Sequence, residues 1–100
     1  MAIIIWSKQS LDDIDAIAAY IKRDSVFYAK AVVDKFISTA ESLSVYPEIG
    51  RIVPYVNEDS IRERFVYSYR LIYQINDNHI EILAVIHGKR ILDIVDLTSS

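Results

Sequence analysis

Two amphipathic helices with almost no loop between them constrain the fold of this chain most strongly. Apolar side chains recur at helical spacing over residues 11–21, and a second such stripe runs over residues 29–43. Ser7 or Ser10 is expected to cap the first helix, and Pro47 and Gly50 are expected to stop the second. The helices must therefore fold back on each other as an antiparallel hairpin whose apolar faces need a partner.

The rest of the chain can supply that partner, because it is rich in β-branched and aromatic residues. Residues 2–6 read AIIIW and predict a short strand, and their lack of alternation predicts that both of its faces are covered. Three further runs predict strands at residues 61–67, 69–75 and 80–87, joined as an antiparallel meander. A last β-branched run at 91–95 is compatible with either a short strand or an ordered tail.

The predicted order is β-α-α-β-β-β, which is an α+β fold with the helical hairpin packed on one face of an antiparallel sheet. With 100 residues, 52% of them hydrophobic and 25% charged, the chain is expected to form a single globular domain, residues 1–100. The second face of the sheet would stay partly open, and we expect a functional site there.

Composition excludes several kinds of site. The absence of cysteine excludes disulfides, thiolate metal sites and a cysteine nucleophile, and it is consistent with a cytoplasmic protein. The two histidines lack the spacing of metal ligands, and two glycines are too few for a phosphate-binding loop, so we expect no metal and no cofactor. No apolar run approaches the ~18 residues of a membrane helix, and the apolar start is too short for a signal peptide.

The basic residues are distributed unevenly along an acidic chain. The net charge of -3 is unlike that of a protein that works mainly by gripping nucleic acid. Five of the six arginines nevertheless follow residue 50: Arg51, Arg62, Arg64, Arg70 and Arg90. Because arginine binds carboxylate or phosphate through a planar two-pronged fork, the second half is expected to carry a local cationic surface.

Strand alternation permits four polar side chains to converge on one surface of the sheet. They are Arg62, Arg64, Arg70 and His87, with Arg90 just beyond. Arginines could hold a phosphodiester there while histidine acts as general acid or base. The alternative is structural, with the arginines paired to Glu63, Glu81 or Asp93 and the histidine merely hydrogen-bonded, and spacing alone favours this alternative.

Three tyrosines at even spacing can be interpreted in two ways. Tyr67, Tyr69 and Tyr73 would share one face of the sheet, where they could stack on nucleic-acid bases or pack in the core. Core packing is the favoured interpretation, because one sheet face must bury the helical hairpin.

Four motifs in order resemble the RelE/ParE superfamily, also known as the plasmid stabilisation protein family, over nearly the full length. The first is Trp6-Ser7 followed by the first helix, and the second is residues 46–54, reading YPEIGRIVP. The third is residues 61–73, which end in YRLIY. The fourth is residues 85–90, which read VIHGKR.

The resemblance implies the toxin component of a type II toxin–antitoxin system, which inhibits bacterial growth and pairs with an antitoxin protein in a hetero-oligomer. ParE-like members poison DNA gyrase, whereas RelE-like members are metal-independent endoribonucleases that cut mRNA on the ribosome. Arg70 and His87 would be catalytic if this chain is RelE-like. The resemblance leaves Arg51, Arg62, Arg64 and Arg90 as candidates for binding the substrate or target.

Departures from the RelE pattern favour the ParE type. The chain is acidic, residues 57–59 read NED where RelE-like members carry lysines, and no tyrosine follows residue 73. Endoribonuclease activity stays open as the alternative, and so does a degenerate, non-toxic interaction module.

Overall fold

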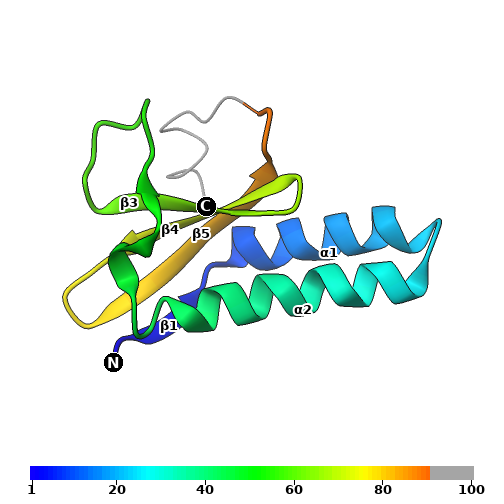
Figure 1. Cartoon of the computed structure of the whole chain (residues 1–100), viewed down its shortest axis with the longest axis horizontal. Coiled ribbons are helices and arrows are strands. Elements are labelled where there is room, and N and C mark those ends of the chain that lie inside the picture. Colours follow the sequence, from blue (N-terminus) through cyan, green and yellow to red (C-terminus); the bar gives the residue numbers. More distant parts are fainter. Residues whose placement is uncertain (91–100) are drawn as a thin grey trace.

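The computed structural model describes residues 1–90, which form two long helices packed against a five-stranded sheet (Figure 1). The elements in chain order are β1 (Ile3–Trp6), α1 (Lys8–Lys22), α2 (Val26–Ser42), the short 3-10 helix η1 (Pro47–Ile49), β2 (Arg51–Ile52), β3 (Ile61–Val66), β4 (Tyr69–Ile75) and β5 (His79–His87). The predicted α+β architecture is confirmed, including the helical hairpin on one face of the sheet. The predicted run at 91–95 lies outside the described residues.

The sheet is mixed, whereas an antiparallel sheet was predicted. Its strand order is β1-β5-β4-β3-β2, and β1 runs parallel to β5 while the other neighbours are antiparallel. The physical reason lies in β5, whose residues from Ile80 onward are largely buried on both faces. Such a strand must lie inside the sheet, and β1 covers its free edge.

Each long helix begins at a serine cap. Ser7 accepts a hydrogen bond from the backbone N–H of Ser10 at 3.0 Å, so the first of the two predicted caps is the one used. The Ser7 hydroxyl also donates to the carbonyl of Leu83 at 3.0 Å, which ties the start of α1 to β5. Ser25 caps α2 in the same way through the N–H of Tyr28.

The main core lies between the hairpin and the sheet. Its fully buried members include Phe36 and Leu43 from the α2 region, Leu71 and Tyr73 from β4, and Ile82 from β5. Burial of each such side chain stabilises the fold by about 1.5–3 kcal/mol. The apolar stripe predicted for α2 is thus the surface that holds the sheet.

A second, smaller core covers part of the opposite face, called here the open side. The segment between β2 and β3 folds over it, so that Val53 and Val56 pack on Ile61, Ile72 and the neighbouring side chains of β5. The open side is therefore partly covered, and what remains accessible lies towards the far end of β5.

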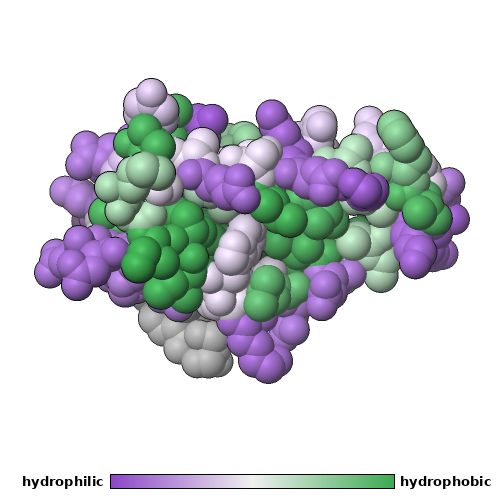
Figure 2. Space-filling model, turned by 90° about the horizontal axis from the view of Figure 1, so that it is seen from below, coloured by the Kyte–Doolittle hydropathy of each residue, from purple (hydrophilic) through white to green (hydrophobic). Residues whose placement is uncertain are grey.

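Two local predictions are wrong. The strand β1 is not covered on both faces, because the main core covers only the face with Ile4 and Trp6. Ile3 and Ile5 on the other face are 67% and 45% exposed. Tyr67 ends no strand but begins the turn between β3 and β4, with a φ of 54°. Figure 2 looks at the helix side and shows hydrophobic surface at the end that carries β1 and again along the helices.

Candidate functional site

The strand register separates the arginines that alternation permitted to converge. In the β3–β4 ladder Arg62 lies opposite Tyr73 and Arg64 opposite Leu71, so both arginines face the helix side. Arg70 lies opposite Phe65 and therefore faces the open side. Directly paired residues share a face of a sheet, so these arginines cannot form one surface.

His87 is likewise separated from Arg70. It is paired with Tyr69, and the two rings meet edge to face with their centroids 5.9 Å apart. Tyr69 in turn packs against Phe36 of α2, which places His87 on the helix side. The His87–Arg70 pair expected for a RelE-like centre is thus split between the two faces in the residues that the structure describes.

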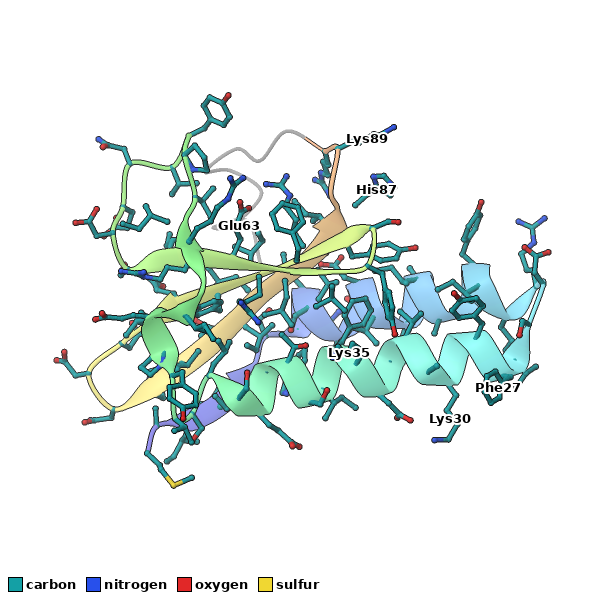
Figure 3. All side chains as sticks on the ribbon, viewed as in Figure 1. Phe27, Lys30, Lys35, Glu63, His87 and Lys89 are labelled. Carbon is teal, nitrogen blue, oxygen red and sulfur yellow. The ribbon has the colours of Figure 1, made fainter. Side chains whose placement is uncertain are left out.

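Glu63 occupies the position on the open side where Arg70 and Arg51 meet. Figure 3 shows Glu63 on the side of the sheet that faces away from the helices. Its side chain is fully buried, and it accepts a hydrogen bond from Nη1 of Arg70 at 2.7 Å and another from Nε of Arg51. Register explains the meeting, because Arg51 pairs directly with Glu63 across β2 and β3.

Arg70 is almost completely enclosed. Its side chain is 9% exposed, and its Nη2 donates to the carbonyl of Arg90, the last described residue. Its Nε is buried and has no hydrogen-bond partner among the described residues. A guanidinium that is buried and paired with Glu63 has its charge neutralised locally and cannot reach out to a large substrate.

A pocket of about 240 Å³ opens next to this ion pair. Its lining comes from β2 and the segment after it, from Arg70 and from the residues that follow β5: Arg51, Val53, Pro54, Tyr55, Arg70, Gly88, Lys89 and Arg90. The lining contains four cationic side chains and no acidic one, and two of the four, Arg51 and Arg70, are paired with Glu63 beneath it. The pocket therefore suits an anionic or strongly hydrogen-bond-accepting group of a partner.

Arg62 has a structural role. Its Nη1 donates to the carbonyls of Glu48 and Gly50 at 3.2 and 3.0 Å, which holds the segment around η1 against β3. The Tyr73 hydroxyl holds the same segment, because it donates a hydrogen bond to the carbonyl of Pro47 and accepts one from the N–H of Gly50. Burial raises the pKa of Tyr73, which keeps its hydroxyl protonated as a donor.

Arg64 and His87 form no ion pair with the residues that the structure describes. The Nε of Arg64 is buried without a partner among the described residues. His87 is exposed, and its Nδ1 accepts a hydrogen bond from the N–H of Lys89 at 3.2 Å. A neutral imidazole with that contact carries its hydrogen on Nε2, so His87 can donate a hydrogen bond to a ligand.

Two features of this region were not predicted from the sequence. Lys89 and Tyr55 line the pocket, yet neither stood out by type or spacing. The structure confirms the structural alternative for Arg70, whose guanidinium pairs with Glu63. The available signal was the place of Glu63 between two arginines in the sequence RER, which did not reveal that its carboxylate is buried.

Other kinds of site find no support in residues 1–90. No group of three side chains there could hold a metal ion, and no helix there is long and apolar enough to cross a membrane.

Comparisons with known proteins agree on one family. The family model described as the ParE toxin of the type II toxin–antitoxin system parDE matches residues 4–92. Toxin RelE2 of Caulobacter vibrioides is 30% identical over 92 residues, which cover 91% of this chain and all of that protein.

Solved structures share the fold. A chain of the chromosomal ParDE system from P. aeruginosa superposes with a TM-score of 0.73 at 17% identity, covering 89% of this chain and 98% of that one. The YoeB dimer from Staphylococcus aureus gives 0.61 at 22% identity, covering 86% and 95%. With a family match over almost the whole length and the expected fold beneath it, the chain belongs to the ParE toxin family, within the RelE/ParE superfamily of type II toxin–antitoxin toxins.

Proposed function

We propose that this toxin is of the ParE type and inhibits growth by binding DNA gyrase in the cytoplasm, not by cutting RNA. The matching family model is that of ParE, which supports this choice within the superfamily. The acidic net charge supports it as well, because an RNA-cleaving protein gains affinity from a basic surface.

The separation of Arg70 from His87 is the observation that carries the proposal. Cleavage of a phosphodiester needs a general acid or base and a charge-stabilising cation within hydrogen-bond reach of the same substrate. Here Arg70 is buried against Glu63 on the open side, while His87 is exposed on the helix side. Neither residue can act on the other's substrate without a rearrangement of the sheet.

The open side is better suited to binding than to chemistry. Around the cationic pocket Arg51 lies over the ring of Phe65, with its guanidinium carbon 5.4 Å from the ring centroid. Phe65 and Tyr55 are 55% and 83% exposed. Exposed aromatic rings beside arginine are typical of the side chains that dominate protein–protein binding energy.

A RelE-like ribonuclease remains the second candidate. It is favoured by the name of the 30% identical relative, Toxin RelE2, and by the exposed imidazole of His87 close in sequence to Lys89 and Arg90. In this case catalysis would centre on His87 without the help of Arg70. A toxin fold that has lost its activity is the third outcome.

Induced expression with two parallel readouts tests the proposal. We expect an SOS response, filamentous cells and gyrase-dependent DNA breaks, while mRNA stays intact. His87→Ala should remain toxic, as should the matched control His79→Ala, whereas the double substitution of Arg51 and Lys89 by Ala should relieve toxicity. mRNA cut at codon positions, together with loss of toxicity in His87→Ala alone, would replace the proposal with the ribonuclease. Harmless expression of the folded wild type would indicate the inactive module.

A further inference from the structure

The carboxylate of Glu63 is an anion that the protein itself supplies to its cationic pocket. It is fully buried on β3, and it accepts a hydrogen bond from Nη1 of Arg70 at 2.7 Å and another from Nε of Arg51. Both arginines also line the pocket of about 240 Å³. The same two guanidinium groups therefore bind the carboxylate and border the space that a ligand would enter.

Two arginines around one oxyanion form an arrangement that can also bind phosphate. Guanidinium groups donate hydrogen bonds to carboxylate and phosphate with similar geometry. A phosphate that entered the pocket of the wild-type protein would compete with Glu63 for the donors of Arg51 and Arg70. It would also be repelled by the Glu63 charge, because like charges interact strongly where little water screens them.

The other two cations of the lining do not replace these donors. Lys89 forms no ion pair within residues 1–90, but its ammonium attracts anions as a point charge and lacks the planar fork of arginine. Arg90 is not free either. While Glu63 is in place, the pocket therefore suits a single acceptor group of a protein better than a phosphodiester.

One donor of the cluster has no partner among the described residues. Nε of Arg70 is buried and unpaired, in a side chain that is only 9% exposed. A buried N–H without an acceptor is unfavourable. The cluster around Arg70 thus has a donor to offer to a further acceptor, and Glu63 does not satisfy it.

We propose that Glu63 determines the ligand specificity of the pocket, because its carboxylate occupies the position of a phosphate between Arg51 and Arg70 and so excludes phosphate groups, including those of RNA. The inference deepens the proposed function, since it explains how an arginine-rich site can belong to a toxin that does not cut RNA. Removal of the Glu63 side chain would open both guanidinium groups to an external oxyanion.

Glu63→Ala tests the inference, because inorganic phosphate should take the place of the lost carboxylate. A ligand that binds only the folded state stabilises it by mass action. In about 20 mM phosphate the melting temperature of Glu63→Ala should rise at least about 4 °C above its value in chloride of equal ionic strength. The wild type should rise by no more than about 1 °C, which measures the general stabilisation of a fold by phosphate.

Two control variants show where the phosphate binds. Glu41→Ala removes an exposed carboxylate of α2 and should respond like the wild type. The double variant Glu63→Leu, Arg70→Met lacks both the anion and its buried cation, and it should not respond beyond the wild type either. If Glu63→Ala is unfolded in chloride, all proteins are compared at one concentration of trimethylamine N-oxide, which favours the compact state.

Three results would overturn the inference. A response of Glu63→Ala no larger than that of Glu41→Ala would show that the position between the arginines takes no phosphate. An equal response of the wild type would show that Glu63 does not exclude it, and an equal response of the double variant would show that Arg70 does not bind it. The assay contains neither gyrase nor RNA, so its result is independent of the target of the toxin.

Discussion

Glu63→Gln should destabilise the fold out of proportion to the single atom that it changes. The carboxylate is fully buried and serves Arg70, whose side chain is 9% exposed, at 2.7 Å. The amide removes the negative charge and leaves the Arg70 guanidinium buried without compensation. Breaking one partner of a buried pair in this way costs about 3–5 kcal/mol, a large part of the ~5–15 kcal/mol that stabilises a typical domain.

The expected loss of folding free energy in Glu63→Gln is large enough to measure as a fall in melting temperature. For a domain of this size each 1 kcal/mol lowers the melting temperature by about 4–8 °C, so the midpoint should fall by at least about 12 °C. Arg51→Ala tests the second ion pair of the Glu63 carboxylate. The side chain of Arg51 is 59% exposed. Its ion pair is screened by solvent, and its loss should cost only about 0–1 kcal/mol.

Thermal and urea unfolding followed by circular dichroism would measure both variants. Replacing Glu63 and Arg70 together, by Leu and Met, should recover most of the stability because no buried charge is left unpaired. A Glu63→Gln protein that melts within 2–3 °C of the wild type, roughly a 0.5 kcal/mol effect, would refute the view that Arg70 is a buried, neutralised residue.

Other substitutions test the anchors of the fold. Ser7→Ala removes the cap of α1 and its bond to the carbonyl of Leu83, and should cost about 1–2 kcal/mol in urea unfolding. Gly50→Ala should destabilise severely, because its Cβ would lie 2.5 Å from the Tyr73 hydroxyl and 2.7 Å from the Glu63 carbonyl. Since burial raises the pKa of Tyr73, the folded state holds that proton more tightly than the unfolded chain. Stability should therefore fall as the pH rises above the ordinary tyrosine pKa of 10.0, and in a titration of stability against pH Tyr73→Phe should remove this part of the alkaline loss.

The elements themselves could be predicted from the sequence because they are encoded locally. Apolar residues at a spacing of three and four predicted α1 and α2, and β-branched runs predicted β3, β4 and β5, mostly to within a residue or two. The cap of α1 at Ser7 and the end of α2 before Pro47 depend on local side chains, so they too were predicted from the sequence, whereas the Ser25 cap of α2 was not.

The position of each strand in the sheet was decided by tertiary structure. Residues 2–6 look like a fully buried strand, yet their strand lies at the edge of the sheet, because β5 occupies the inner place between it and β4. Pairing between strands far apart in the chain depends on the summed burial of all strands, which no single segment records.

The same distinction applies to the candidate site. The sequence by itself determined which cationic side chains are present and that most of them lie on strands. It also determined the family to which the chain is similar. Which of them meet was decided only when the register placed Arg70 opposite Phe65 and His87 opposite Tyr69, on opposite faces. A shift of one residue turns every side chain of a strand to the other face of the sheet. Alternation within one strand therefore shows which of its residues share a face. Only the pairing between strands shows which residues of different strands lie on the same face.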